Sequence, residues 1–465
     1  MTRTICMLLL YIFSLPANGQ EQAQPKYLVG TGEYQCFIIN SSTGRAYGVS
    51  NNLPAAGVPW DAGIPGLPVR VGIPEDVFLV DIASGLHNSL AVDRNGEVWT
   101  WGSNVVGESG TGSVADLGIA PVKISVDSSG EPFKDVVAVT CWSWGATETA
   151  NGNIALKSDG TVWIWGNTMG GMRGNGQAGQ VNTRPVQVRI PEGKKIVKVV
   201  AGCIVIALAS DGTVWTWGGN NFKVLLGTNS ADYTHPHRLP LPQRAKDIAG
   251  GNFFSYALGV NGTLYGWGFY TPYLGIGNRG YLGGEPPPAA PRDLTRELNL
   301  PHPVSSVVTN SVSTHVILTD GSLWGWGDNA CGCVGNGKEL DFANHNPPYA
   351  WDWGPGELLV QKPVRLLKGV NNFVRIFGGS CAVFYTYAET ATGQLYSWGR
   401  NKGSVIGNGV VGASPDILAV YPNSWDVTEP TLVDPFALKD NKVVTSPWCI
   451  LHPDGSPCNQ FRTRQ

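Results

Sequence analysis

A short phrase of apolar and polar positions recurs along the chain. Each copy has an apolar stretch of strand length, a tight turn of the Asp-Gly or Asn-Gly type, and a second apolar stretch that ends in an aromatic residue and glycine. One clear copy runs from Ala207-Leu208 through Asp211-Gly212 to Trp215-Thr216-Trp217-Gly218. Asp-Gly and Asn-Gly favour hairpin turns, and Val, Trp, Tyr and Thr favour strands, so each copy predicts a β-hairpin.

Seven copies can be counted, and consecutive copies lie 50 to 72 residues apart, which leaves room for about four strands in each unit. Their terminal glycines are Gly48, Gly102, Gly166, Gly218, Gly268, Gly327 and Gly399. The strands are apolar at nearly every position, which predicts sheets covered on both faces. Because such a unit cannot bury its faces alone, neighbours must stack and close into a ring. The sequence therefore predicts an all-β, seven-bladed β-propeller.

Composition agrees with this architecture. The chain has 61 glycines and 17 tryptophans in 465 residues, and only 14% of its residues are charged. Ten of the 17 tryptophans belong to the repeated phrase. With 42% hydrophobic residues the chain can bury a large core, which excludes an intrinsically disordered protein.

The two ends of the chain carry separate predictions. Residues 1–20 read as a signal peptide, because Arg3 precedes an apolar run from Ile5 to Leu15 that is followed by the cleavage pattern Ala17-Asn18-Gly19. The alternative is an N-terminal anchor or a core segment. Residues 21–465 are expected to form one domain that is secreted, periplasmic or extracellular. No later apolar stretch approaches about 18 residues, so we expect no membrane span.

Charge and cysteine content limit the classes of ligand. The net charge is −3 and there is no basic block, which argues against a nucleic-acid partner. Export would permit disulfides, but the pairing stays open. Cys331-Gly-Cys333 lacks histidines at zinc-finger spacing, so we expect disulfides or buried thiols there and no metal site. The disulfide candidates are Cys36, Cys331, Cys333, Cys449 and Cys458.

The phrase SDGTVWTWGGN, which begins at Ser210, resembles the repeat of the regulator of chromosome condensation (RCC1) family, and the resemblance covers nearly all of residues 27–455. It implies a seven-bladed propeller. The founding member is a nuclear exchange factor for a small GTPase that docks on nucleosomes. This chain departs from it by its expected signal peptide and by lacking a basic arm. It looks more like secreted bacterial relatives that inhibit β-lactamases through the loops of one face.

Residues 430–455 look like a partial eighth unit without a closing aromatic-Gly strand. Propellers of the family often close the ring with strands from both termini. We therefore expect this fragment to complete the ring, with an added cap as the alternative.

The longest segment between repeats, 328–375, is the predicted binding site. Aromatic side chains beside carboxylates suit a protein contact or a sugar ring, although they could also simply cover the rim. The binding candidates are Phe342, Tyr349, Trp351 and Trp353, and the candidates for a catalytic role are Asp341, His345 and Asp352.

We therefore expect a secreted, monomeric binding module that uses loops on one face, without cofactor or catalysis. The expected partner is an extracellular or periplasmic protein, or a polysaccharide. The alternative is a carbohydrate-active propeller, either a polysaccharide lyase or a glycoside hydrolase, because acids from different blades could meet on one face. No GxSxG, HExxH or P-loop motif appears. His87 is expected to be structural, and the loop pair His235 and His237 lacks a cluster that would complete a metal site.

Overall fold

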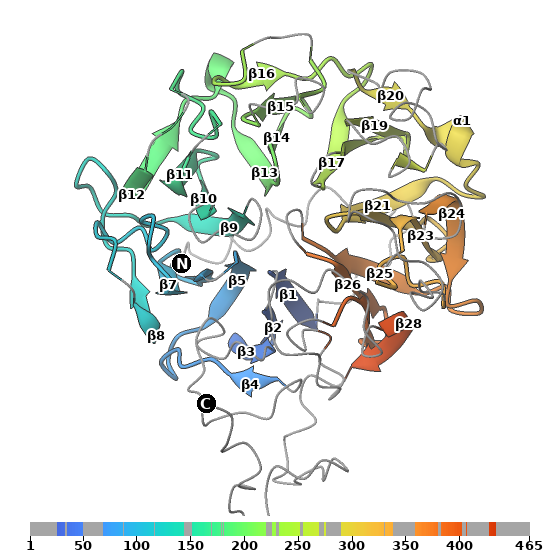
Figure 1. Ribbon diagram of the computed structural model, residues 1–465, viewed down its shortest axis with the longest axis horizontal. Coiled ribbons are helices and arrows are strands. Elements are labelled where there is room, and N and C mark those ends of the chain that lie inside the picture. The colour runs from blue at the N-terminus through green and yellow to red at the C-terminus, as the bar shows by residue number, and fades with distance from the viewer. Residues whose placement is uncertain are drawn as a thin grey trace, which may run out of the picture.

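Seven four-stranded antiparallel sheets are arranged as blades around a central axis in the computed structural model (Figure 1). Each blade is built from four strands that are consecutive in the chain, so the predicted seven-bladed propeller is confirmed. The structure describes residues 26–32, 35–49, 68–86, 88–115, 117–143, 151–168, 170–177, 179, 181–219, 226–228, 232–251, 254–268, 274–275, 290–329, 331–337, 359–379, 383–401, 406 and 427–433.

The first four blades span residues 27–238. Blade 1 contains β1 (Tyr27–Thr31), β2 (Cys36–Asn40), β3 (Arg45–Val49) and β4 (Val69–Arg70). Blade 2 contains β5 (Leu79–Ser84), β6 (Asn88–Asp93), β7 (Val98–Gly102) and β8 (Gly118–Lys123). Blade 3 contains β9 (Val136–Ser143), β10 (Asn151–Lys157), β11 (Val162–Asn167) and β12 (Val181–Val188). Blade 4 follows a short 3-10 turn (Pro191–Gly193) and contains β13 (Ile196–Ala201), β14 (Val205–Ala209), β15 (Val214–Trp217) and β16 (His237–Arg238).

The last three blades span residues 245–433. Blade 5 contains β17 (Ala245–Gly250), β18 (Phe254–Gly259), β19 (Leu264–Gly268) and β20 (Arg292–Asp293), and is followed by the helix α1 (Thr295–Leu298). Blade 6 contains β21 (Val304–Thr309), β22 (Ser313–Leu318), β23 (Leu323–Asp328) and β24 (Leu359–Leu366). Blade 7 contains β25 (Phe373–Phe377), β26 (Tyr385–Thr390), β27 (Leu395–Gly399) and β28 (Val427–Val433).

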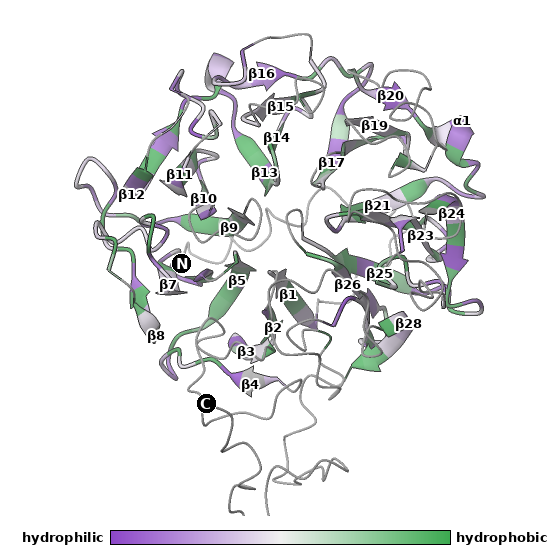
Figure 2. Ribbon diagram, viewed as in Figure 1, coloured by the Kyte–Doolittle hydropathy of each residue, from purple (hydrophilic) through white to green (hydrophobic). Residues whose placement is uncertain are grey.

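The repeated phrase forms the second and third strands of each blade. Every residue of β6, β14, β18, β22 and β26 is buried, which confirms that both faces of the blades are covered. The outermost strands β4 and β16 are coloured as polar in Figure 2, whereas the innermost β5 and β13 are largely apolar. The blades therefore bury their middle strands and expose their outer edges to solvent.

The propeller has two different faces. We call the loop face the one that carries the connection between the third and fourth strand of every blade, because β3, β7, β11, β15, β19, β23 and β27 all end there. We call the opposite one the turn face. It carries the tight turns between second and third strands and the linkers between blades.

Asp and Thr or Ser together fix the tight turns. In blade 4, Asp211 Oδ1 accepts hydrogen bonds from the amide (3.0 Å) and the hydroxyl (2.6 Å) of Thr213. The same hydroxyl lies 3.3 Å from Trp215 Nε1, which donates to it. Blades 3 and 6 repeat this pattern with Asp159 and Asp320. A local Asx turn thus anchors the first tryptophan of the phrase.

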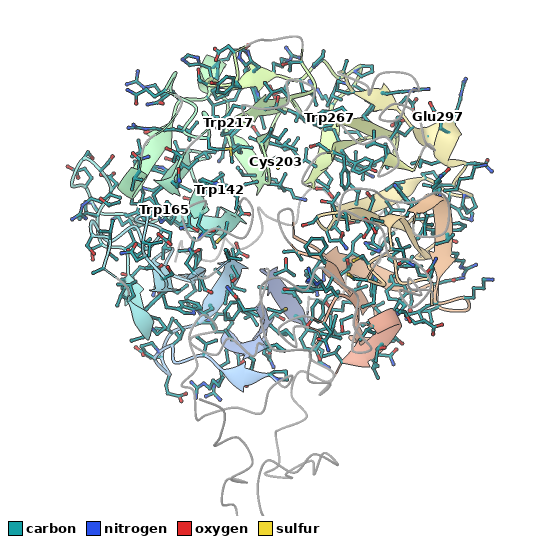
Figure 3. All side chains as sticks on the ribbon, in the orientation of Figure 1. Trp142, Trp165, Cys203, Trp217, Trp267 and Glu297 are labelled. Carbon is teal, nitrogen blue, oxygen red and sulfur yellow. The ribbon has the colours of Figure 1, made fainter. Side chains whose placement is uncertain are left out.

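The second tryptophan of the phrase packs against a glycine of the preceding blade. These tryptophans are fully buried: Trp101, Trp165, Trp217, Trp267, Trp326 and Trp398. A Cβ at Gly335, in the connection after β23, would lie 2.6 Å from Cδ1 of Trp398 on β27. Gly110 meets Trp165, Gly174 meets Trp217, Gly227 meets Trp267 and Gly275 meets Trp326 in the same way. Figure 3 shows Trp165, Trp217 and Trp267 within the blades, whereas Glu297 lies at the outer rim of the ring.

Each of these glycines has a positive φ, between +64° and +81°, so glycine is favoured for both conformation and space. The buried indole N–H also finds an acceptor. Trp165 and Trp217 donate to the carbonyls of Glu108 (2.9 Å) and Met172 (2.8 Å) in the same loops. Trp398 donates to Nε2 of buried His315 (3.2 Å), whose pKa burial lowers to about 4. The connections therefore act as inter-blade packing as well as loops.

The ring closes without exchange of strands between the termini, as far as the described residues extend. Residues 430–433 of the predicted partial repeat belong to β28, the fourth strand of blade 7, where Leu432 pairs with Tyr396 of β27. Residues 434–455 lie outside the described part. Blade 7 meets blade 1 through Tyr385. Its hydroxyl lies 2.8 Å from the carbonyl of Gly32 and 3.0 Å from that of Gln35, and it accepts the amide of Gly32 at 3.1 Å.

Gly335→Ala tests the packing of tryptophan on glycine, with Gly130→Ala as its control. Both glycines have positive φ (+81° and +90°), but only Gly335 has atoms within reach of a new Cβ. We expect Gly130→Ala to cost about 1–2 kcal/mol from backbone strain, and Gly335→Ala about 2–5 kcal/mol because overpacking is added. Urea denaturation measures both. Equal losses would contradict the packing argument.

Tyr385→Phe tests the junction between blades 7 and 1. Removing the hydroxyl leaves the carbonyl of Gly32 without this donor, whereas the amide of Gly32 and the carbonyl of Gln35 still bond to each other at 2.9 Å. We therefore expect a loss of about 1–3 kcal/mol in the free energy of unfolding. Tyr396→Phe, in the same blade, should stay within about 0.5 kcal/mol. Thermal melts of the two variants provide the comparison, and a neutral Tyr385→Phe would show that the ring does not depend on this hydroxyl.

Candidate functional site

The predicted binding segment is only partly described. Asp341, Phe342, His345, Tyr349, Trp351, Asp352 and Trp353 all lie outside the described residues, so their assignment stays a prediction. The later part of 328–375 is not a loop, because it contains β24 and the start of β25. The strands that flank the remaining connection end at Asp328 and begin at Leu359, which pair with each other at the loop face.

Three exposed valines lie on the loop face near the junction of blades 2 and 3. Val105, Val114 and Val181 are 41%, 55% and 52% exposed. The first two lie in the connection after β7, and Val181 begins β12. The connection packs on β12, because the amide of Gly112 donates to the carbonyl of Thr183 (2.8 Å). We call these three valines the valine patch. On the turn face the most exposed large apolar side chain among the described residues is Val260, at 58%.

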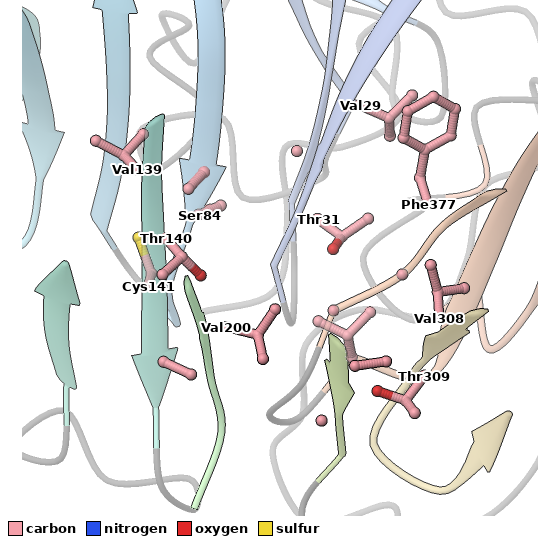
Figure 4. A pocket seen from close by; sticks show the side chains of 18 of the residues that line it. Val29, Thr31, Ser84, Val139, Thr140, Cys141, Val200, Val308, Thr309 and Phe377 are labelled. Atoms are coloured by element: carbon pink, nitrogen blue, oxygen red, sulfur yellow. The ribbon is translucent and has the colours of Figure 1, made fainter. Parts of the chain in front are cut away.

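The centre of the ring holds a cavity of about 270 Å³, which we call the channel. The first strand of every blade contributes to its wall: β1, β5, β9, β13, β17, β21 and β25. Aliphatic side chains such as Val29 and Val200 alternate with the hydroxyl-bearing Thr31, Thr140 and Thr309 (Figure 4). The wall is thus mixed in polarity, with aliphatic side chains next to hydroxyl groups.

Six of the seven inner strands share a β-bulge at the same position, where one extra residue turns the next side chain. The residues after the bulge are Asp81, Ala138, Lys198, Asp247, Ser306 and Arg375. Lys198 forms an ion pair with Asp247 of the next blade, and Arg375 pairs with Glu389 of its own blade. The bulges therefore place a set of charged side chains around the ring.

Asp81 differs from the other charged members of this set. Its Oδ2 accepts the amide of Val139 on β9 at 2.8 Å, and the amide of Ile82 also donates to the carboxylate. Burial raises the pKa of Asp81 to about 7, because these neutral donors only partly offset the loss of hydration. Sequence reasoning missed this residue, because nothing in the repeated phrase marks which first-strand position faces the channel.

The cysteine predictions need correction. Cys36, Cys141, Cys203 and Cys331 are buried thiols without a disulfide in the described part of the chain. Cys36 packs beside Tyr385 and Tyr387 at the blade junction, and burial raises the pKa of its thiol to about 12. Cys333 donates through Sγ to the carbonyl of Phe384 at 3.2 Å. Disulfides at Cys36, Cys331 and Cys333 are therefore not supported, because these thiols fill buried sites between blades. Cys449 and Cys458 lie outside the described residues.

The histidine pair is held by one carboxylate. Asp232 Oδ2 lies 2.7 Å from His235 Nδ1 and 3.6 Å from His237 Nε2. Over the described residues, no group of three or more His, Cys, Asp or Glu side chains has the arrangement needed to hold a metal ion. His87 lies outside the described residues, as does His345. Among the parts of the chain that are described, no helix combines the length and apolar character required to cross a membrane.

Comparison with known proteins finds similarity to proteins that contain RCC1 repeats. Residues 79–108 and 211–258 match models of the regulator of chromosome condensation (RCC1) repeat. The chain is similar to the mitochondrial RCC1 domain-containing protein RUG3 of Arabidopsis thaliana, at 29% identity over 64% of this chain and 59% of that protein. It is also similar to protein pim1 of Schizosaccharomyces pombe, at 25% identity over 79% of this chain and 65% of pim1. The chain thus spans less than two thirds of these two relatives.

Solved structures show the same fold. Prp20p from Saccharomyces cerevisiae aligns with a TM-score of 0.62 at 22% identity, over 89% of each chain. Human WBSCR16 aligns with a TM-score of 0.59 at 18% identity, over 77% of this chain and 85% of that one. The chain is therefore a β-propeller. More particularly, two of its segments match the RCC1 repeat, which supports the resemblance seen in the repeated phrase.

The channel carboxylate makes stability depend on pH. The folded-state pKa of Asp81 is about 7 and the unfolded value is about 3.9, so the folded state favours the protonated acid. Stability from this group is present below about pH 4 and is lost as the pH rises to about 7. We expect Asp81→Asn to be more stable than the unaltered protein by about 1–3 kcal/mol at pH 8 and by little at pH 4. Urea denaturation at both pH values measures this difference. A difference that does not change with pH would contradict the raised pKa.

Proposed function

We propose that this protein is a non-catalytic protein-interaction module that binds its partner through the loop face. The observation that carries the proposal is geometric, because all seven connections between third and fourth strands leave from this one face. Loops on a rigid scaffold are the usual place for binding residues. The valine patch adds exposed apolar area on the same face, of the kind found at protein contacts.

Relatives of the same fold support a protein partner. Prp20p is described with its binding properties to Gsp1p and histones, and yeast RCC1 (Prp20) is described bound to Kap60. These partners belong to those proteins. For this chain we carry over only the type of function, namely a propeller that binds another protein. The extracellular or periplasmic setting rests on the signal-peptide prediction for residues 1–20, which lie outside the described part.

The carbohydrate-active alternative gains no support. Its candidates Asp341, His345 and Asp352 are outside the described residues, and none of the relatives reported above is described as acting on a glycan. Along the described channel wall, Asp81 has no second carboxylate beside it of the kind that glycoside hydrolysis requires. We therefore do not propose catalysis.

The test uses one aspartate substitution on each face. Val181→Asp places a charge in the valine patch, and Val260→Asp makes the same change at a similarly exposed valine on the turn face. Partners are captured with the unaltered protein from its native surroundings and identified, and their affinity for each variant is then measured. We expect Val181→Asp to weaken binding about tenfold or more, because burying an unpaired charge is costly. Val260→Asp should bind as the unaltered protein does.

The same experiment can overturn the proposal. Thermal melts first establish that both variants are folded. If Val260→Asp weakens the partner as much as Val181→Asp, or weakens it alone, the loop face is not the binding face. Turnover of the captured molecule by the purified protein would instead contradict a non-catalytic role.

A further inference from the structure

The channel contains a charge that its surroundings do not balance. The positions after the bulges include four charged residues, of which Asp81 and Lys198 line the channel, and three of the four have a partner of opposite charge. Lys198 is paired with Asp247, and Arg375 is paired with Glu389. Asp81 is held only by the neutral amides of Val139 and Ile82 among the described residues. The β-bulge in β5 thus leaves the Asp81 carboxylate in the channel wall without a cation beside it among the described residues.

The other titratable groups near Asp81 do not supply this cation. On β9, which packs against β5, Cys141 lines the channel as a buried thiol, and its pKa is raised by burial and by Asp81 itself. On β6, Asp93 accepts the amides of Asn95 and Glu97 and the indole N–H of Trp99.

The strands of blade 1 that touch β5 are neutral at this point. Tyr27 of β1 and Cys36 of β2 belong to the apolar cluster shared with blade 7, and neither carries a positive charge. Lys198, on the far part of the wall, is already paired with Asp247. A cation beside Asp81 would therefore have to come from outside the described chain.

The shape of the channel indicates the kind of cation. Its volume of about 270 Å³ is close to the lower range of small-molecule pockets. Aliphatic side chains of Val29, Val139, Val200 and Ile248 line it beside the hydroxyl groups. A strongly hydrated metal ion gains little from an aliphatic wall, and the described residues hold no metal-ligand cluster. A short hydrocarbon chain with one ammonium group matches both the wall and the carboxylate.

We propose that the channel binds a small aliphatic primary amine in its ammonium form. The ammonium donates to the Asp81 carboxylate, and the alkyl chain packs on the valines and Ile248 of the wall. Charge-assisted hydrogen bonds of this type are short and strong in partly buried sites. Binding does not involve the loop face, so the channel ligand is separate from the protein partner.

The ionisation of Asp81 gives the site a pH signature. The ammonium requires the ionised carboxylate, so affinity should be highest above pH 7 and should fall about tenfold for each pH unit below it. Near pH 7 about half of the free sites are protonated, so binding should release about half a proton for each site occupied. A ligand that merely fills the apolar space would show neither effect.

Isothermal titration calorimetry with n-butylammonium and n-butanol tests the proposal on the whole protein. We expect n-butylammonium to bind at pH 8 and n-butanol to bind at least tenfold more weakly. Asp81→Asn should reduce the n-butylammonium affinity at least tenfold and abolish proton release, measured in buffers of different ionisation enthalpy. Asp76→Asn makes the same chemical change at an exposed carboxylate close in sequence, and its affinity should stay within about twofold.

Three outcomes would overturn the proposal. They are the absence of binding heat for n-butylammonium, equal affinity for n-butanol, and unchanged binding by Asp81→Asn. A denaturation curve of Asp81→Asn shows that it is folded, and the structure predicts that it is at least as stable as the unaltered protein. Loss of ammonium binding therefore reports on the site rather than on unfolding.

Discussion

The contact between a buried tryptophan and a glycine of the preceding blade is the interaction on which the ring depends. It links five pairs of neighbouring blades in the described structure, and in each case the glycine has a positive φ and no room for a Cβ. The connection between third and fourth strands therefore has two tasks, since it covers the next blade and also presents residues on the loop face. This explains how connections of very different length can remain attached to a regular scaffold.

The ring also closes through packing between neighbouring blades, but the contact there is made by a tyrosine hydroxyl instead of a tryptophan on a glycine. Blades 1 and 7 are each made of consecutive strands, and among the described residues no strand pairing joins the first blade to the last. Their junction relies on packing and on the Tyr385 hydroxyl, which meets the backbone of Gly32 and Gln35. Cys36, a disulfide candidate by sequence, instead fills the apolar cluster at this junction. Buried thiols of this kind behave as small hydrophobic side chains.

The channel and the loop face are physically distinct. The loop face is built from connections that vary between blades, whereas the channel is built from first strands, six of which share one bulge. The bulge sets the direction of a side chain but does not choose its type. Substitutions at this one position, such as Asp81 in blade 2 and Lys198 in blade 4, can therefore change the chemistry of the channel without altering the blades.

The sequence by itself determined the all-β class and the number of blades. It could do so because the turn signals and the aromatic-Gly strands are local and repeat seven times. Tertiary structure decided the rest. Whether Asp81 faces a core or a channel depends on a bulge and on six other blades, and the state of Cys331 and Cys333 depends on the atoms of the next blade. These contacts join residues far apart in the chain, so a local sequence pattern cannot predict them.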